Sequence, residues 1–138
     1  MKTKIMRHGF ILMLLALLSG MFVSQMAIPR LGLSAHTIGV LSGVLLIAVG
    51  AVFQEFSLTT GQTKTMYWAW LISSYLNWLA CLAGAILGTG MATPLASNGL
   101  EGNAFNEFVV TAMLVVVVIT SFAAVGLSIW GLRSKANA

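Results

Sequence analysis

The feature that most constrains the fold of this chain is the near absence of charge along its length. Only 7% of its 138 residues are charged, whereas 59% are hydrophobic. About a quarter of the residues in a soluble domain are charged, so a chain of this composition would expose large apolar patches to water. The sequence therefore predicts an integral membrane protein.

The apolar residues gather in four stretches that have the length of membrane-spanning helices. The stretches cover residues 9–27, 35–53, 66–90 and 105–132. Each reaches the roughly 20 residues that a helix needs to cross a bilayer. We interpret Pro29 as the residue that stops the first helix. A cleaved signal peptide is the alternative for the first stretch, but its apolar run is longer than a typical signal core. We expect an all-α, four-helix transmembrane bundle that forms a single domain over residues 1–138.

Basic residues are distributed unevenly between the two sides of such a bundle. With four spans, one side holds Lys2, Lys4, Arg7, Lys64, Arg133 and Lys135, and the other side holds only Arg30. The positive-inside rule then places both termini in the cytoplasm, and we expect a bacterial inner membrane. The net charge of +4 forms no basic patch, so a nucleic-acid partner is not expected.

Few residues in the chain could carry chemistry. It has two histidines, three acidic residues and one cysteine. No acidic residue lies clearly inside a span, so the sequence offers no proton relay. Paired carboxylates, a Ser/His/Asp triad, a phosphate-binding loop and a Cys/His zinc cluster all lack residues. A single axial imidazole on a haem is one of the few cofactor roles that remain.

His36 carries most of the functional argument. It stands near the head of the second span, and Gly39 and Gly43 follow at helical steps of three and four, on the same face. Glycines at this spacing let two helix backbones touch, or let a flat group approach the helix. An ionisable group inside a membrane segment is costly and usually has a partner. Ligand, catalytic and structural roles for His36 therefore all stay open.

The third span carries a second polar stripe. Ser73, Asn77 and Cys81 follow one another at steps of four. Asn77 must find hydrogen-bond partners because hydrocarbon offers none. From spacing alone, interhelical packing is the favoured interpretation of this stripe.

Three segments of the chain resemble a known family. They are residues 7–10 (Arg-His-Gly-Phe), residues 29–36 (Pro-Arg-Leu-Gly-Leu-Ser-Ala-His) and residues 75–80 (Tyr-Leu-Asn-Trp-Leu-Ala). On these segments the chain resembles the hydroxylaminobenzene mutases over essentially its whole length. More distantly, it is similar to styrene oxide isomerase.

The resemblance implies a membrane isomerase that moves the hydroxyl group of hydroxylaminobenzene from nitrogen to the ring, giving 2-aminophenol. Styrene oxide isomerases are trimers that bind haem b, so the resemblance also implies a homo-oligomer, with a trimer favoured. His36 would then ligate ferric iron that acts as a Lewis acid. Gly39 and Gly43 would lie against the porphyrin, and Arg30 could pair with a haem propionate.

The chain departs from the styrene oxide isomerase pattern around the substrate. Where that enzyme uses asparagine, aspartate and tyrosine, this sequence has Ser42, Ser73 and Cys81. The departure favours the mutase reaction over epoxide rearrangement and leaves Asn77 as the best polar candidate. We expect these four residues at the catalytic site. A non-catalytic packing protein and a small-molecule transporter remain as alternatives from other classes.

Overall fold

The computed structural model describes residues 1–133, and these residues form helices joined by short connections. The long helices are α1 (Lys2–Gly20), α2 (Pro29–Ala51), α3 (Thr60–Leu87) and α5 (Ala104–Gly131). Each of the four is long and apolar enough to cross a membrane. Short helical turns, η1 (Val23–Gln25), η2 (Phe53–Glu55) and α4 (Pro94–Ser97), lie in the connections. The expectation of an all-helical membrane protein is confirmed, and no strand occurs within residues 1–133.

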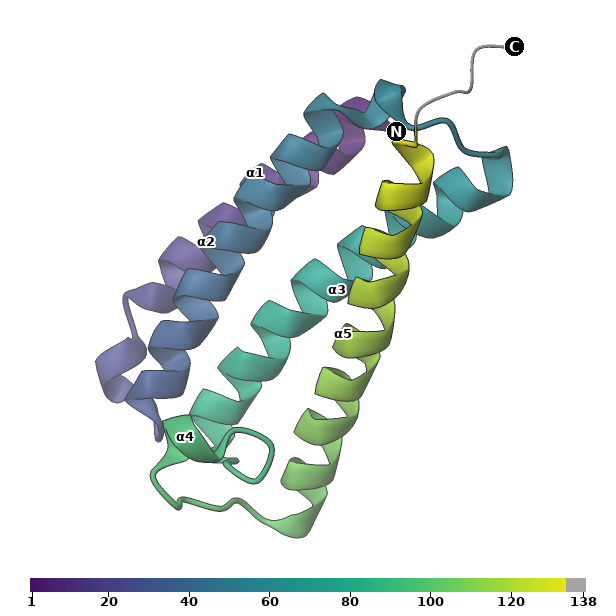
Figure 1. The fold of residues 1–138 in the computed structure, drawn as a ribbon. Helices are drawn as coiled ribbons and strands as arrows, with labels where there is room; N and C mark the ends of the chain where they lie inside the picture. Colours follow the sequence, from purple (N-terminus) through teal and green to yellow (C-terminus); the bar gives the residue numbers. More distant parts are fainter. Residues whose placement is uncertain (134–138) are drawn as a thin grey trace.

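The long helices form two antiparallel pairs that lie beside each other (Figure 1). α1 packs along α2 and α3 packs along α5, while α2 also contacts α3 and so joins the pairs. α1 begins at the end of the bundle where α5 ends, and α4 lies at the opposite end, where α2 begins. Lys135, which the charge argument used, lies outside the described residues.

The connection between α1 and α2 differs from the expectation. Pro29 does not stop the first helix but is the first residue of α2. Proline is well suited to this position because the N–H group that it lacks would be unpaired at a helix start. α1 ends at Gly20, before the predicted boundary at residue 27. Arg30 therefore lies on a helix and not in a loop.

α3 begins earlier than the sequence predicts. The backbone N–H of Gln62 donates to the Thr59 hydroxyl at 3.3 Å, and the Thr59 N–H donates to the Gln62 side chain at 3.0 Å. This reciprocal capping box starts the helix within a stretch whose polarity suggested a loop. α3 ends at Leu87, and the residue that caps it, Gly88, has a φ of 68°, a left-handed conformation that glycine adopts without strain. The predicted bounds of the last span agree with α5 to within a residue.

A buried carboxylate fixes the loop between α3 and α5. Glu107, in the first turn of α5, is only 5% exposed, although the sequence analysis placed no acidic side chain clearly inside. Its Oε1 accepts hydrogen bonds from the N–H groups of Gly90 at 2.8 Å and Gly102 at 2.7 Å. Its Oε2 accepts one from Met91 at 3.1 Å. Buried N–H groups need such partners, so Glu107 serves the architecture of this loop.

We expect Glu107→Gln to lower the thermal unfolding temperature in detergent by several degrees, measured by circular dichroism. The amide nitrogen of glutamine cannot accept the N–H groups that a carboxylate oxygen accepts, so at least one buried donor loses its partner. Glu101→Gln is the matched control, because Glu101 is exposed in the same loop. Identical unfolding temperatures for the two variants would contradict the role of Glu107 in holding this loop.

Candidate functional site

His36 lies in the second turn of α2 and faces α1. Its Nδ1 is 2.9 Å from the carbonyl oxygen of Ala16, a fully buried residue of α1. A carbonyl can only accept, so Nδ1 carries the proton and donates. The lone pair of the neutral ring is then on Nε2. α1 thus fixes both the tautomer and the orientation of this half-buried imidazole, and leaves the ring lone pair on Nε2.

Gly20, one helical turn after Ala16 on α1, makes room for the His36 ring. A Cβ built at Gly20 would collide with Nδ1 and would lie 3.0 Å from both Cγ and Cε1 of His36. Glycine at this position therefore lets the imidazole lie directly against the α1 backbone. Gly20 and Ala16 could not be recognised from the sequence, because neither carries a side chain with chemistry of its own.

Gly39 and Gly43 face α1 and not an open surface. A Cβ at Gly39 would lie 2.5 Å from the methyl group of Ala16, and one at Gly43 would lie 2.7 Å from a backbone oxygen of α1. This is the close helix packing that the spacing of small residues predicts. α1 covers this face, together with Trp78 of α3 at Gly39, and the two glycines bring Ala16 close to His36. Contact of the two glycines with a cofactor stays a prediction.

The four residues expected at the catalytic site come from two helices. They are Ser42 on α2 and Ser73, Asn77 and Cys81 on α3. Cys81 Sγ lies 4.0 Å from Asn77 Oδ1, and the Ser73 hydroxyl donates to a carbonyl of its own helix at 3.2 Å. No hydrogen bond among the described residues joins these side chains to His36. Their catalytic role stays a prediction.

Arg30 lies in the first turn of α2, less than two helical turns before His36. Its Nη1 makes one long, exposed hydrogen bond of 3.5 Å to Asn98 Oδ1. Arg30 also lines an open groove of about 420 Å³, whose other lining residues are Leu33, Ser34, Thr37 and Ile38. The positively charged Arg30 side chain, held by one long hydrogen bond, therefore lies on the outer side of the α2 turns that carry His36.

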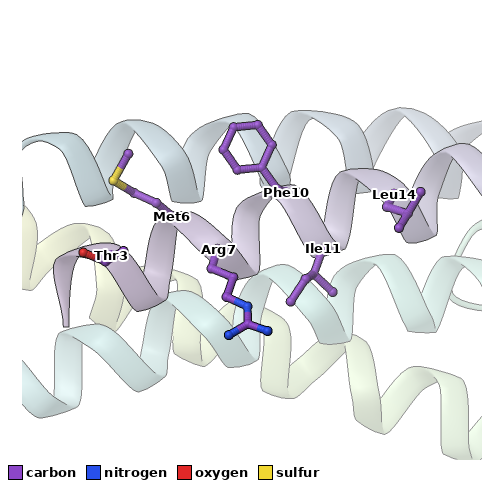
Figure 2. Close-up of a pocket in the computed structure, with 6 residues that line it drawn as sticks. All are labelled: Thr3, Met6, Arg7, Phe10, Ile11 and Leu14. Atoms are coloured by element: carbon purple, nitrogen blue, oxygen red, sulfur yellow. The ribbon is translucent and has the colours of Figure 1, made fainter.

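An open depression lies elsewhere, on the outer face of α1 (Figure 2). Its volume is about 470 Å³ and it is lined by Thr3, Met6, Arg7, Phe10, Ile11 and Leu14. All six side chains come from one helix, and most are apolar. Such a surface suits lipid contact, and it brings no set of catalytic groups together.

His8, the other histidine, has separate surroundings. Its Nδ1 is 3.2 Å from the hydroxyl oxygen of Tyr75, and that hydroxyl donates to the His8 carbonyl at 3.1 Å. His8 lies about 12 Å before Ala16 along α1, at roughly 1.5 Å of rise per residue. One metal centre therefore cannot bind both imidazoles of one chain.

Comparison with known proteins decides the family. The family model described as styrene oxide isomerase matches residues 1–133. The chain belongs to the styrene oxide isomerase family. Hydroxylaminobenzene mutase HabB of Ectopseudomonas oleovorans is 36% identical over 132 residues, which cover 95% of this chain and 80% of that protein. Hydroxylaminobenzene mutase HabA of the same organism is 30% identical over 125 residues, which cover 90% of this chain and 93% of that protein.

No solved structure is significantly similar to the chain. Membership of the styrene oxide isomerase family identifies the chain as an isomerase, and its four apolar helices agree with a membrane enzyme. The resemblance that rested on residues 7–10, 29–36 and 75–80 is confirmed. The non-catalytic packing protein is therefore set aside.

Gly20→Ala tests whether the close packing of the His36 ring against the α1 backbone determines the activity. The added Cβ would displace the His36 ring, and misplacing a reacting group by about 1 Å costs on the order of 10²-fold in rate. Alanine favours helix by roughly 1 kcal/mol over glycine, so the variant should stay folded. We expect the initial rate of isomerisation, measured chromatographically in detergent, to fall by about that factor.

Gly126→Ala is the control for this experiment. A Cβ at Gly126, also inside a long helix, would meet nothing within 4 Å, so the rate should not change. A Gly20→Ala variant with full activity would show that the position of the His36 ring does not matter to the reaction.

Proposed function

We propose that the protein is a membrane-embedded mutase that rearranges hydroxylaminobenzene and related arylhydroxylamines to 2-aminophenols, with His36 as the ligand of a ferric haem b. The N–O bond breaks and a C–O bond forms at the ortho carbon. That carbon loses its proton and nitrogen gains one. Reactant and product contain the same atoms, so no co-substrate is consumed. The similarity to two proteins named hydroxylaminobenzene mutase, at 36% and 30% identity, supports this substrate class.

The observation that carries the haem proposal is the hydrogen bond from His36 Nδ1 to the Ala16 carbonyl, 2.9 Å long. Histidines that ligate metals commonly donate their other ring N–H to a carbonyl or carboxylate, which fixes the tautomer. No group of three or more His, Cys, Asp or Glu that could hold a bare metal ion occurs in the described part of the chain. A porphyrin brings four nitrogen ligands of its own and needs only one imidazole from the protein. The donor set at His36 therefore fits a haem.

A bound ferric haem would supply the Lewis acid that polarises the N–O bond. The chain's own residues hold the imidazole in place, because α1 packs over the inner side of His36 and the Ala16 carbonyl accepts its Nδ1–H. An aromatic substrate is apolar enough to reach such a site from the bilayer. Arg30, at the head of the same helix, could exchange its weak bond to Asn98 for a haem propionate.

The substrate-side residues favour the mutase reaction. Ser42, Ser73 and Cys81 stand where styrene oxide isomerase has an asparagine, an aspartate and a tyrosine, so the polar groups for epoxide opening are missing. Asn77 is the remaining amide that could orient the N-hydroxyl group. Rearrangement of an epoxide to an aldehyde is the second candidate, because the family model that matches the chain is that of styrene oxide isomerase.

We also propose a homo-oligomer, with a trimer favoured by the family resemblance, in a bacterial inner membrane with both termini in the cytoplasm. The basic residues support this orientation. Lys2, Lys64 and Arg133 belong to the start of α1, the start of α3 and the end of α5, which share one end of the bundle (Figure 1). Arg30 lies at the head of α2, at the opposite end.

We expect the purified wild-type protein to show a Soret band and to convert hydroxylaminobenzene to 2-aminophenol in detergent, without added cofactor or membrane potential. His36→Ala should lose the band and lose at least about 100-fold in rate. Removing a residue that only hydrogen-bonds to a metal ligand already costs about 10- to 100-fold in activity, and removing the ligand itself should cost more. Visible spectra and product chromatography on the same samples measure both effects.

His8→Ala is the control, since His8 contacts Tyr75 and not the His36 site. It should keep the band and the rate. An active wild type without a Soret band would exclude haem and leave the imidazole itself as the acid–base group. A protein that isomerises styrene oxide but not hydroxylaminobenzene would favour the second candidate. No conversion of either substrate would agree with a transporter.

A further inference from the structure

We propose that Ser19 and Trp78 are positioning residues that tune the imidazole of His36: Ser19 shares the Ala16 carbonyl with His36, and Trp78 acts on that carbonyl through Ser19. The tuning of a bound iron rests on the proposed haem ligation. The hydrogen-bond arrangement itself does not depend on that function. Neither residue touches the reacting atoms in this proposal.

A relay of hydrogen bonds joins three helices at this point. The indole Nε1 of Trp78, on α3, donates to the Ser19 hydroxyl at 3.3 Å. The Ser19 hydroxyl, on α1, donates to the Ala16 carbonyl at 3.0 Å. The same carbonyl accepts the bond from Nδ1 of His36, on α2, at 2.9 Å. The Ala16 oxygen is therefore the common acceptor of a serine and a histidine.

The direction of every bond in the relay follows from the chemistry of its groups. An indole N–H can only donate, and a backbone carbonyl can only accept. Ser19 accepts from Trp78, so its own proton is free to go to Ala16. No rotation of the hydroxyl satisfies both neighbours in another way. The relay therefore always delivers a donor to the oxygen that holds His36.

Sharing one oxygen between two donors weakens the bond that each of them makes. Ser19 therefore reduces the pull of the Ala16 carbonyl on the Nδ1 proton of His36. Trp78 increases this effect, because a hydroxyl that accepts a hydrogen bond becomes a better donor. A weaker bond at Nδ1 makes Nε2 a weaker electron donor. Iron bound at Nε2 would then stay electron-poor, as a Lewis acid requires.

The molecule contains a second relay of the same three groups, and it lacks a histidine. Trp70 Nε1, on α3, donates to the Ser128 hydroxyl at 3.0 Å, and that hydroxyl donates to the Ala124 carbonyl of α5 at 2.7 Å. This relay joins α3 to α5, and no hydrogen bond among residues 1–133 links it to His36 or Ala16. Removing either serine hydroxyl costs the same kind of interhelical bond, so any effect on His36 must come from the relay through Ser19.

The test compares Ser19→Ala with Ser128→Ala, in full-length protein with haem bound. In Ser19→Ala we expect a higher iron–histidine stretching frequency in resonance Raman spectra of the ferrous protein, and a more negative midpoint potential. Turnover should fall about tenfold with KM little changed, within the range for partners of metal ligands. Trp78→Phe should shift the frequency and the potential in the same direction, but less. Ser19→Thr retains the hydroxyl and should have the stretching frequency, midpoint potential and turnover of the wild type.

The same variants are tested without haem by ¹⁵N NMR of histidine-labelled protein in detergent. The chain has only two histidines, so His36→Ala assigns the signals. In wild type we expect the Nδ1-protonated tautomer at His36. Its proton resonance should move downfield in Ser19→Ala and stay in place in Ser128→Ala. An Nε2-protonated His36 would overturn the proposal, as would a Ser19→Ala spectrum identical to wild type.

The two arms separate this inference from the proposed function. A wild-type protein that cannot be loaded with haem refutes the cofactor, and the NMR comparison then decides the relay alone. A haem protein in which Ser19→Ala and Ser128→Ala behave alike keeps the cofactor and refutes the relay. A shift of the potential in the positive direction in Ser19→Ala also refutes it, because it reverses the predicted sign.

Discussion

The close approach of α1 to α2 is the constraint on which the rest of the site depends. Lipid tails are as apolar as the helix surfaces, so helices in a bilayer associate through packing and hydrogen bonds and not through exclusion of water. Gly39 and Gly43 on α2 remove the side chains that would hold the backbones apart, and Gly20 on α1 leaves room for the ring of His36. Only at this separation can the Ala16 carbonyl reach the ring of His36.

A backbone carbonyl as the partner of His36 has chemical consequences. It is a weaker acceptor than a carboxylate, so it orients the imidazole without placing a negative charge beside it. The few acidic side chains of the chain are used or located elsewhere: Glu107 binds three N–H groups of a loop, and Glu55 and Glu101 are exposed. An uncharged site of this kind suits an isomerisation, in which neither electrons nor protons are gained or lost overall.

Hydropathy was enough to predict the number and type of the long helices, because a bilayer requires about 20 apolar residues for each span. The ends of the helices follow other rules. Pro29 opens α2 because its ring suits the first turn, and Thr59 with Gln62 starts α3 inside a polar stretch. These are local hydrogen-bond and steric effects that an apolar count does not contain. The end of α5 was predicted well because there the change in polarity and the end of the helix coincide.

The site was only half visible in the sequence, for a related reason. His36 could be found because an imidazole in an apolar segment needs a partner. Its partner could not be found, because the carbonyl of Ala16 is a group that every residue has and only the fold selects. The pattern of Gly39 and Gly43 likewise gave the face but not what covers it, and α1 covers it. Where polar side chains are this scarce, backbone carbonyls and the absence of side chains do the positioning, and neither leaves a motif in the sequence.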